Sequence, residues 1–264
     1  MADKSFGGIA MLGATVSFPA NHPRDRAFFT AFAATCWAGV LFGFFPSSSA
    51  RIMGQADYVA PLILHIHAAS YVGWLGLLTV QIGLIRTRRT NMHRKFGLIG
   101  LLLIPVMAYS GIAAELYSQR FYIGQGDGGL AFFILPLFYT VAFVLFAAAA
   151  VSFAHRDPAT HKRLILLATT VIVGPAYARW WGEALRSAFG DDYWGMILNS
   201  FAGTNLILAA AIAYDIMTRG RPHRAYWIGV PLILLGELGC SWLYNSGWWP
   251  PIARQLIEIR LPLT

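Results

Sequence analysis

Seven long stretches of predominantly apolar residues, separated by short polar segments, constrain this chain more than any other feature. Because an α-helix rises 1.5 Å per residue, each stretch is long enough, or nearly so, to cross about 30 Å of hydrocarbon. We therefore expect an all-α fold, a polytopic integral membrane bundle with seven transmembrane helices. The expected helices span residues 28–46, 59–85, 95–116, 130–153, 163–185, 193–217 and 226–248.

The composition favours a membrane protein over a large soluble core. Of the 264 residues, 57% are hydrophobic and 12% are charged, about half the charged fraction of ~25% in soluble domains. Both cysteines, Cys36 and Cys240, lie in apolar stretches, so no disulfide framework is predicted. No low-complexity linker divides the chain, and the N-terminus lacks the pattern of a signal peptide. We expect a single transmembrane domain over residues 1–264.

The net charge is +8, and its distribution indicates membrane topology rather than a nucleic-acid partner. Of the 20 Lys and Arg residues, 14 precede the first stretch or follow the second, fourth and sixth, whereas five lie on the opposite side. The positive-inside rule then predicts a multi-pass protein of the cell inner membrane with a cytoplasmic segment over residues 1–27 and an outside C-terminus. The tail, residues 249–264, is too short and charged to span again. We expect it on the outer surface, after Pro250 and Pro251 end the seventh helix.

Two histidines, His93 and His161, open the third and fifth expected helices beside basic residues. Asp157 is a good N-cap for the fifth helix, and Pro158 fits its first position. The positive potential at a helix N-terminus favours neutral imidazole, which is the form that binds metal or haem iron. Alternatively, histidine beside Arg and Lys at a headgroup boundary contacts anionic lipid. The sequence leaves both alternatives open.

Two further histidines, His65 and His67, lie in the second expected helix, where their separation of two residues turns them about 200° apart. His65 shares its face with a small-residue groove, and His67 shares the other with polar and aromatic side chains. Small residues let a helix or a flat ring approach closely. We therefore expect His65 to be the better cofactor contact, His67 to form an interhelical hydrogen bond, and the helix to be surrounded by protein. The groove comprises Ala69, Gly73, Gly76 and Gly83; the other face comprises Ser70, Tyr71, Trp74 and Gln81.

A polar ligand pocket is expected in the outer half, where Gly174 and Pro175 should kink the fifth helix. Glu237, near the middle of the seventh helix, needs a partner there or must stay protonated, and Arg179 or a histidine is the expected partner. The alternative is that Arg179 pairs with Glu183, one turn away. The candidate pocket residues are His67, Tyr109, Arg179 and Glu237, with His65 as a further wall residue.

The motifs LHIHAASYVG, RTRRTNMHRKFG, AYSG and HRDPATHKRLILL, with a later ARW, resemble the bacterial membrane-protein family catalogued as domain of unknown function 2306. The resemblance covers about residues 60–180, under half of the chain, and its motifs are short. It implies a membrane fold without an assigned activity, and it suggests a comparison with four-helix b-type cytochromes. The matching positions are His65, His93, Gly97, Ser110, Gly111, Asp157, His161 and Arg179.

Three functions follow from these features. The first is a non-catalytic protein with membrane lipids as partners, either an accessory subunit beside other membrane-protein subunits or a binder of a hydrophobic ligand such as a lipid or quinone. The second is a membrane oxidoreductase with haem b, for which His65, His93 and His161 are the candidate ligands. The third, an intramembrane metal hydrolase, needs about three converging ligands on zinc. Only two diverging histidines lie within the membrane, so no metal site is predicted.

Overall fold

The computed structural model describes residues 18–56, 58–124 and 129–258. Residues 1–17 of the predicted cytoplasmic segment and 259–264 of the predicted tail lie outside the described residues. In the described part, the chain is helical and seven helices are long and apolar enough to cross a membrane, which confirms the all-α class and the predicted number of long apolar helices. The chain forms α1 Asp25–Ile52, α2 Leu62–Arg86, α3 Thr90–Gly124, η1 Leu130–Phe133, α4 Ile134–Phe153, α5 Pro158–Phe189, α6 Tyr193–Arg219, α7 Arg224–Tyr244 and α8 Trp249–Glu258.

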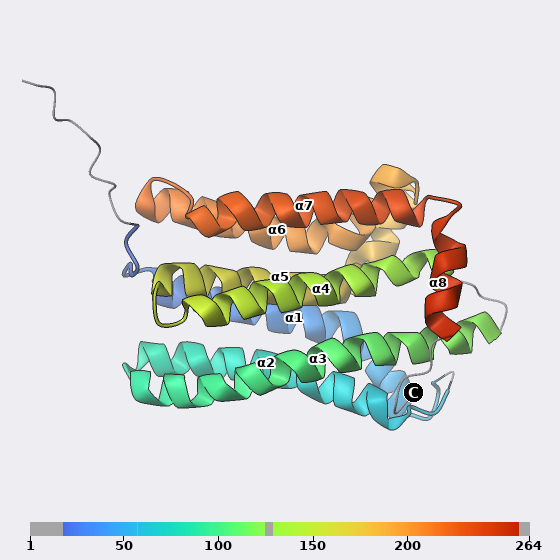
Figure 1. Ribbon diagram of the computed structural model, residues 1–264, viewed down its shortest axis with the longest axis horizontal. Helices are drawn as coiled ribbons and strands as arrows, with labels where there is room; N and C mark the ends of the chain where they lie inside the picture. The colour runs from blue at the N-terminus through green and yellow to red at the C-terminus, as the bar shows by residue number, and fades with distance from the viewer. Residues whose placement is uncertain (1–17, 57, 125–128, 259–264) are drawn as a thin grey trace, which may run out of the picture.

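Consecutive long helices run antiparallel, so α1, α3, α5 and α7 begin at the same end of the bundle (Figure 1). This end is called the basic end below, because most Lys and Arg residues of the connections gather there; the opposite end is the far end. The start of α5 follows the predicted capping mechanism. The Asp157 carboxylate accepts hydrogen bonds from the backbone N–H groups of Ala159 and Thr160, and Pro158 occupies the first turn.

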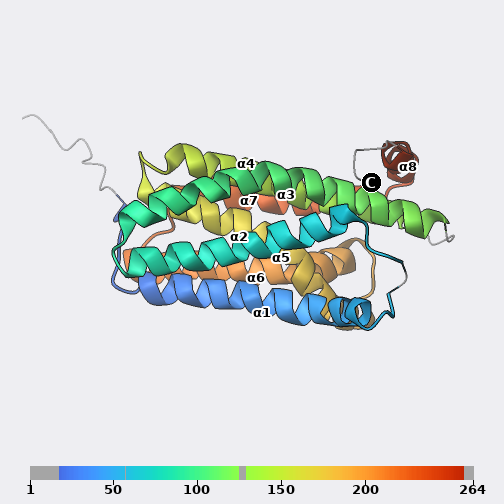
Figure 2. The same ribbon diagram turned by 90° about the horizontal axis from the view of Figure 1, so that it is seen from below.

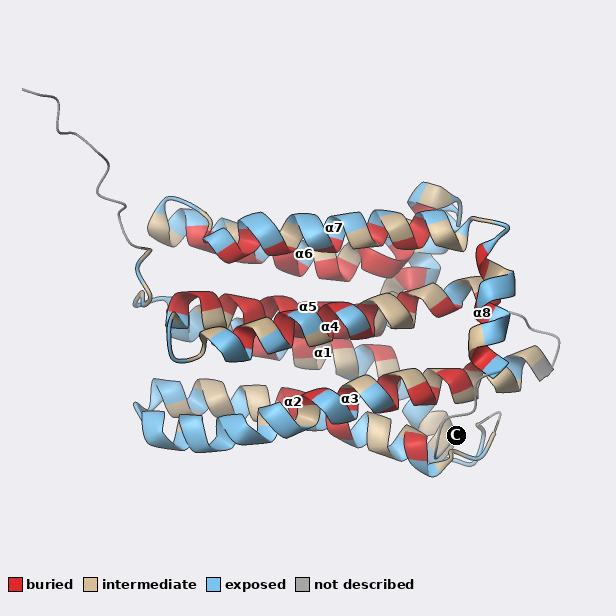
Figure 3. Ribbon diagram, in the orientation of Figure 1, coloured by how far each residue is buried: buried red, intermediate tan, exposed pale blue. Residues whose placement is uncertain are grey.

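The central helix is α5, which packs against α1, α4, α6 and α7. Large apolar side chains that are almost fully buried, such as Phe143, Leu167 and Phe201, fill the space between these helices. The α2–α3 pair lies at the periphery and shows long exposed stretches towards the basic end (Figure 3).

The seventh long helix ends earlier than predicted. Helix α7 stops at Tyr244, and Pro250 and Pro251 lie in the first turn of α8, where a proline removes no helical hydrogen bond. The expectation that these prolines end the seventh helix is therefore wrong. Helix α8 crosses the far end (Figure 1) and buries Trp249 and Ile257 against α3 and η1.

The expectation that the second helix is surrounded by protein is also wrong. Only Ile63, Ser70, Trp74 and Leu75 of α2 are buried. Its glycines do not mark close helix contacts, since a Cβ added at Gly73, Gly76 or Gly83 would meet no atom within 4 Å. Glycines that do permit close approach lie on other helices; for example, a Cβ at Gly43 of α1 would overlap the Ala176 carbonyl, and one at Gly203 of α6 would overlap Tyr177.

Candidate functional site

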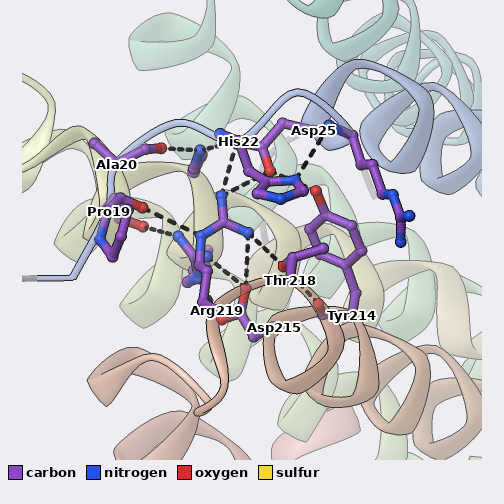
Figure 4. Close-up of polar contacts among 12 residues, drawn as sticks. Pro19, Ala20, His22, Asp25, Tyr214, Asp215, Thr218 and Arg219 are labelled. Carbon is purple, nitrogen blue, oxygen red and sulfur yellow. Dashed lines mark hydrogen bonds and ion pairs between the residues drawn. The ribbon is translucent and has the colours of Figure 1, made fainter.

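A network of ion pairs joins α1, α5 and α6 at the basic end (Figure 4). Its centre is the carboxylate of Asp25, the first residue of α1. It accepts hydrogen bonds from Lys162 Nζ at 2.7 Å, from Arg219 Nη2 at 2.7 and 2.9 Å and from the Tyr214 hydroxyl at 2.6 Å. One carboxylate thus binds side chains from two other helices and fixes the start of α1 on them.

A second carboxylate, Asp215, pairs with Arg163 inside the bundle. Arg163 Nε donates to Asp215 Oδ2 at 2.7 Å and Nη2 donates to Oδ1 at 2.5 Å. The two side chains are only 2% and 1% exposed. A pair this well buried is stabilised by its two-point geometry, and removing either partner would leave an uncompensated charge.

The segment before α1 lies across the ends of α5 and α6. The Phe18 ring lies 4.5 Å from the Arg163 guanidinium carbon and contacts the His223 ring edge-on at 4.6 Å between centroids. The Pro19 carbonyl accepts from Arg219 Nε at 3.2 Å, and the Ala20 carbonyl accepts from Lys162 Nζ. The segment therefore covers the buried charges with an aromatic ring and two carbonyl groups.

Two groups beside the network, His223 and Asp157, lie outside the seven long apolar helices and have shifted pKa values. Burial, and then the charge of Arg163, lowers the pKa of His223 to about 4, so its Nδ1 is free to accept a hydrogen bond from the Ala225 N–H. Partial burial raises the pKa of Asp157, but hydrogen bonds from Thr160 and Arg224 outweigh it and lower the value to about 2. At neutral pH the histidine is neutral and the carboxylate is charged.

The sequence analysis did not predict that Asp25, Asp215 and the cations that bind them form one network. One signal was available: Asp215 is an acidic residue inside an expected transmembrane stretch, and such residues pair with a cation when they are buried. Its partner could not be identified, because Arg163 is 52 residues away and lies among many basic residues at the same end.

His93 and His161 both lie at the basic end, and their rings are close enough to interact electrostatically. His161 Nδ1 is 2.8 Å from the Ala150 carbonyl oxygen, so it carries the proton and leaves Nε2 free. His93 Nδ1 is buried and has no hydrogen-bond partner among the described residues. Helix α3 packs on α2 and α4, and α5 packs on α4, so the two histidines lie on helices that both flank α4.

His65 and His67 point in opposite directions, as their spacing predicts, but the inward ring is His67. Its centroid lies 4.2 Å from that of Tyr71, and its Nδ1 is buried with no partner in the described part of the chain. The His65 side chain is exposed and makes no hydrogen bond to any described residue. The expectation that protein packs closely against the His65 face of α2 is wrong, because the glycine face of α2 turns outward.

The predicted pocket residues do not form one group. Glu237 is 1% exposed, and its Oε2 accepts from Asn205 Nδ2 at 2.8 Å, so its partner is neither Arg179 nor a histidine. The Arg179 guanidinium lies 4.8 Å from the Phe44 ring centroid and interacts electrostatically with His67. The alternative, an Arg179–Glu183 pair, is also absent from the described ion pairs, since Glu183 pairs with Arg186 at 3.0 Å. Tyr109 is 40% exposed on α3.

A groove of about 460 Å³ runs between α1 and α2; these two helices lie side by side in Figure 2. Two hydrogen bonds bridge the helices along it. Trp37 Nε1 donates to Thr79 Oγ1 at 3.0 Å, and Arg86 Nη1 donates to Thr30 Oγ1 at 2.8 Å, nearer the basic end. Along each helix, the residues of the two hydrogen bonds are seven positions apart, so the two bonds are separated by about 10 Å. The lining residues are Thr30, Ala33, Ala34, Trp37, Thr79, Ile82, Gly83, Arg86 and Thr87.

The groove includes Gly83 of the predicted small-residue face but not His65. No group of three or more His, Cys, Asp or Glu residues that could hold a metal ion occurs in the described ranges. Comparison with protein-family models, curated proteins and solved structures finds no match to the chain. The resemblance of residues 60–180 to a bacterial membrane-protein family therefore stays a prediction.

Proposed function

We propose that this is a multi-pass inner-membrane protein that binds a hydrophobic ligand, a lipid or a quinone, in the groove between α1 and α2. The observation that carries this proposal is the groove itself. Its volume of about 460 Å³ lies within the ~300–1,000 Å³ range of small-molecule sites. Its middle is formed by Ala33, Ala34, Ile82 and Gly83, and its polar groups lie towards its two ends.

Two features distinguish this groove from loose packing. The Trp37–Thr79 and Arg86–Thr30 hydrogen bonds fix the spacing of the helices, so the apolar walls between them need not touch. At Gly83, a side chain would fill the space, and no atom lies within 4 Å of a Cβ there. A hydrocarbon chain or ring that lies against these walls gains dispersion contacts on both sides.

The test is to fill the groove with a side chain. We expect Gly83→Leu to preserve the fold, because the position is exposed and Leu favours a helix over Gly. The matched control is Gly73→Leu, on the same helix and equally open but outside the groove. Lipid and quinone that copurify in mild detergent are quantified by mass spectrometry. The proposal is supported if Gly83→Leu loses the copurifying lipid or quinone and Gly73→Leu keeps it. It is contradicted if both variants retain the same amount.

The proposed topology places the basic end in the cytoplasm, which the concentration of Lys and Arg there supports. Single cysteines at Thr90 and Asn245 test it, since these positions are exposed at opposite ends. The native Cys36 and Cys240 are buried and should not react. A membrane-impermeant thiol reagent applied to intact cells should label Asn245→Cys and not Thr90→Cys. Labelling of Thr90→Cys alone would show that the orientation is the opposite of the proposed one.

A second candidate function, a haem-b redox protein, is favoured by the His93 and His161 rings. His161 Nδ1 donates to the Ala150 carbonyl, which leaves Nε2 free in the way that ligating histidines are commonly held. The unpartnered His93 Nδ1 offers a second nitrogen at the same end. Visible spectra of the purified protein, oxidised and reduced, test this candidate. A Soret band that His161→Ala removes would support it, and a spectrum without such a band would exclude it.

A further inference from the structure

Arg86 is the charged group of the α1–α2 groove. It lies in the last turn of α2 with an exposed side chain. One of its five N–H donors binds Thr30 Oγ1 at 2.8 Å. Among the described residues, no carboxylate lies within 4 Å of it. The guanidinium therefore has donors and a full positive charge available at the mouth of the groove.

The charges at the basic end are divided unevenly between its two sides. Every described acidic residue at this end lies in or against α5, α6 and α7 and is already paired: Asp25 with Lys162 and Arg219, Asp157 with Arg224, and Asp215 with Arg163. In the described ranges of α1 and α2, the one acidic side chain is Asp25, and Lys162 and Arg219 already compensate its charge. The exposed cations on the α1–α2 side, none of which forms a described ion pair, are Arg24, Arg26, Arg86, Arg88 and Arg89.

We propose that the ligand of the groove is an anionic phospholipid. One acyl chain lies between α1 and α2 along Ala33, Ile82 and Gly83, and the phosphate accepts hydrogen bonds from the Arg86 guanidinium. This inference rests on the proposed function and names its ligand class. A phosphate meets both needs of the site, because it accepts charge-assisted hydrogen bonds from Arg and compensates the charge of the rim. A quinone head is neutral and would leave Arg86 uncompensated.

The dimensions of the groove agree with this assignment. Arg86 and Thr87 lie at the end of α2, where the headgroup boundary is expected, and the apolar walls extend from them towards the bilayer centre. The Trp37–Thr79 hydrogen bond lies about 10 Å farther along the helices. The groove thus takes the first part of an acyl chain and leaves the remainder in the bilayer.

The experiment compares phosphatidylglycerol with phosphatidylcholine, each titrated against the full-length protein in detergent and measured by native mass spectrometry. Wild type should bind phosphatidylglycerol about tenfold more tightly, because both lipids carry the phosphate but the choline cation of phosphatidylcholine cancels its charge and is repelled by the basic rim. Arg86→Gln should abolish this preference and retain weak binding of both lipids. The control Arg94→Gln removes the same charge at the same end, outside the groove, and should keep the preference.

The outcomes separate this inference from the function on which it rests. If Gly83→Leu reduces binding of both lipids while Arg86→Gln keeps the preference, the groove binds lipid but the role of Arg86 is overturned. If Arg94→Gln reduces the preference as much as Arg86→Gln does, general surface charge explains it and the inference fails. If Gly83→Leu leaves both lipids bound as in wild type, the proposed function fails. A wild type that binds both lipids equally but retains quinone overturns the inference alone.

Discussion

The basic end and the far half of the bundle differ in how their buried charged groups are paired. At the basic end, the carboxylates of Asp25 and Asp215 are bound by several donors each. In the far half, buried atoms of His67, Gln119 and Glu237 have no hydrogen-bond partner among the described residues; at the basic end this holds for Gln81 and His93, which lie outside the ion-pair network. A buried polar atom without a partner costs about 1–3 kcal/mol. The ion-pair network thus stabilises the fold, whereas the unpartnered atoms reduce its stability, so substitutions in the network should cost far more than substitutions of the unpartnered groups in the far half.

The largest effect is expected for Asp215→Asn. It leaves the Arg163 guanidinium, 2% exposed, without its carboxylate, and breaking a buried pair in this way costs about 3–5 kcal/mol. The free energy of unfolding in detergent, measured by SDS or thermal titration, should fall by that amount. The control is Arg224→Gln. The Arg224 side chain is 66% exposed, so its ion pair with Asp157 is expected to stabilise the fold by less than ~1 kcal/mol. Equal losses in the two variants would show that burial does not matter here.

A smaller effect is expected for Asp25→Asn. The carboxylate binds Lys162 and Arg219, but Asp25 and Lys162 are 13% and 20% exposed, so water compensates part of the loss. We expect a loss of about 2–3 kcal/mol, the range of one strong charge-assisted hydrogen bond. Because Asp25 also holds residues 18–24 on the network, limited proteolysis should cut this segment faster in the variant. An unchanged cleavage rate would show that Phe18 and the backbone carbonyls hold the segment without Asp25.

The stability of the basic end should also depend on pH through His223. The unfolded chain takes up a proton near the ordinary pKa of 6.5, whereas the folded chain does so near 4. Lowering the pH through this window therefore favours unfolding, and the contribution of the neutral ring is complete above pH 6.5 and lost by pH 4. A shift of this size is worth at most about 3 kcal/mol. The variant His223→Asn keeps an N-cap acceptor and should lose the pH dependence in this window; a variant as pH-sensitive as wild type would contradict the assignment.

The comparison also shows how far the sequence could predict the molecule. Hydropathy alone identified the seven helices, and the Asp157–Pro158 pair predicted where α5 begins, because both signals are local. The ion pairs were not predictable, since Asp25 meets Lys162 and Arg219 across 137 and 194 residues. The orientation of α2 was predicted wrongly for a different reason. Glycines permit either a close neighbour or open space, and at Gly73, Gly76 and Gly83 the structure has open space.

The smallest effects are expected in the far half, and they test the other side of the comparison. His67→Phe removes the buried Nδ1 that has no partner and retains a ring beside Tyr71. Glu237→Gln keeps an oxygen that can accept from Asn205. Since neither change breaks a described hydrogen bond of the side chain, we expect the free energy of unfolding to stay within about 0.5 kcal/mol of wild type, or to rise for His67→Phe.

The matched control for these two variants is Asn205→Leu, which leaves both Glu237 oxygens buried without a donor and should cost about 1–3 kcal/mol. A loss of that size in His67→Phe itself would mean that His67 Nδ1 has a partner in the membrane, such as a bound ligand. In that case the far half holds a binding site of its own. The two regions would then differ because the far half binds a ligand, not because its polar groups reduce stability.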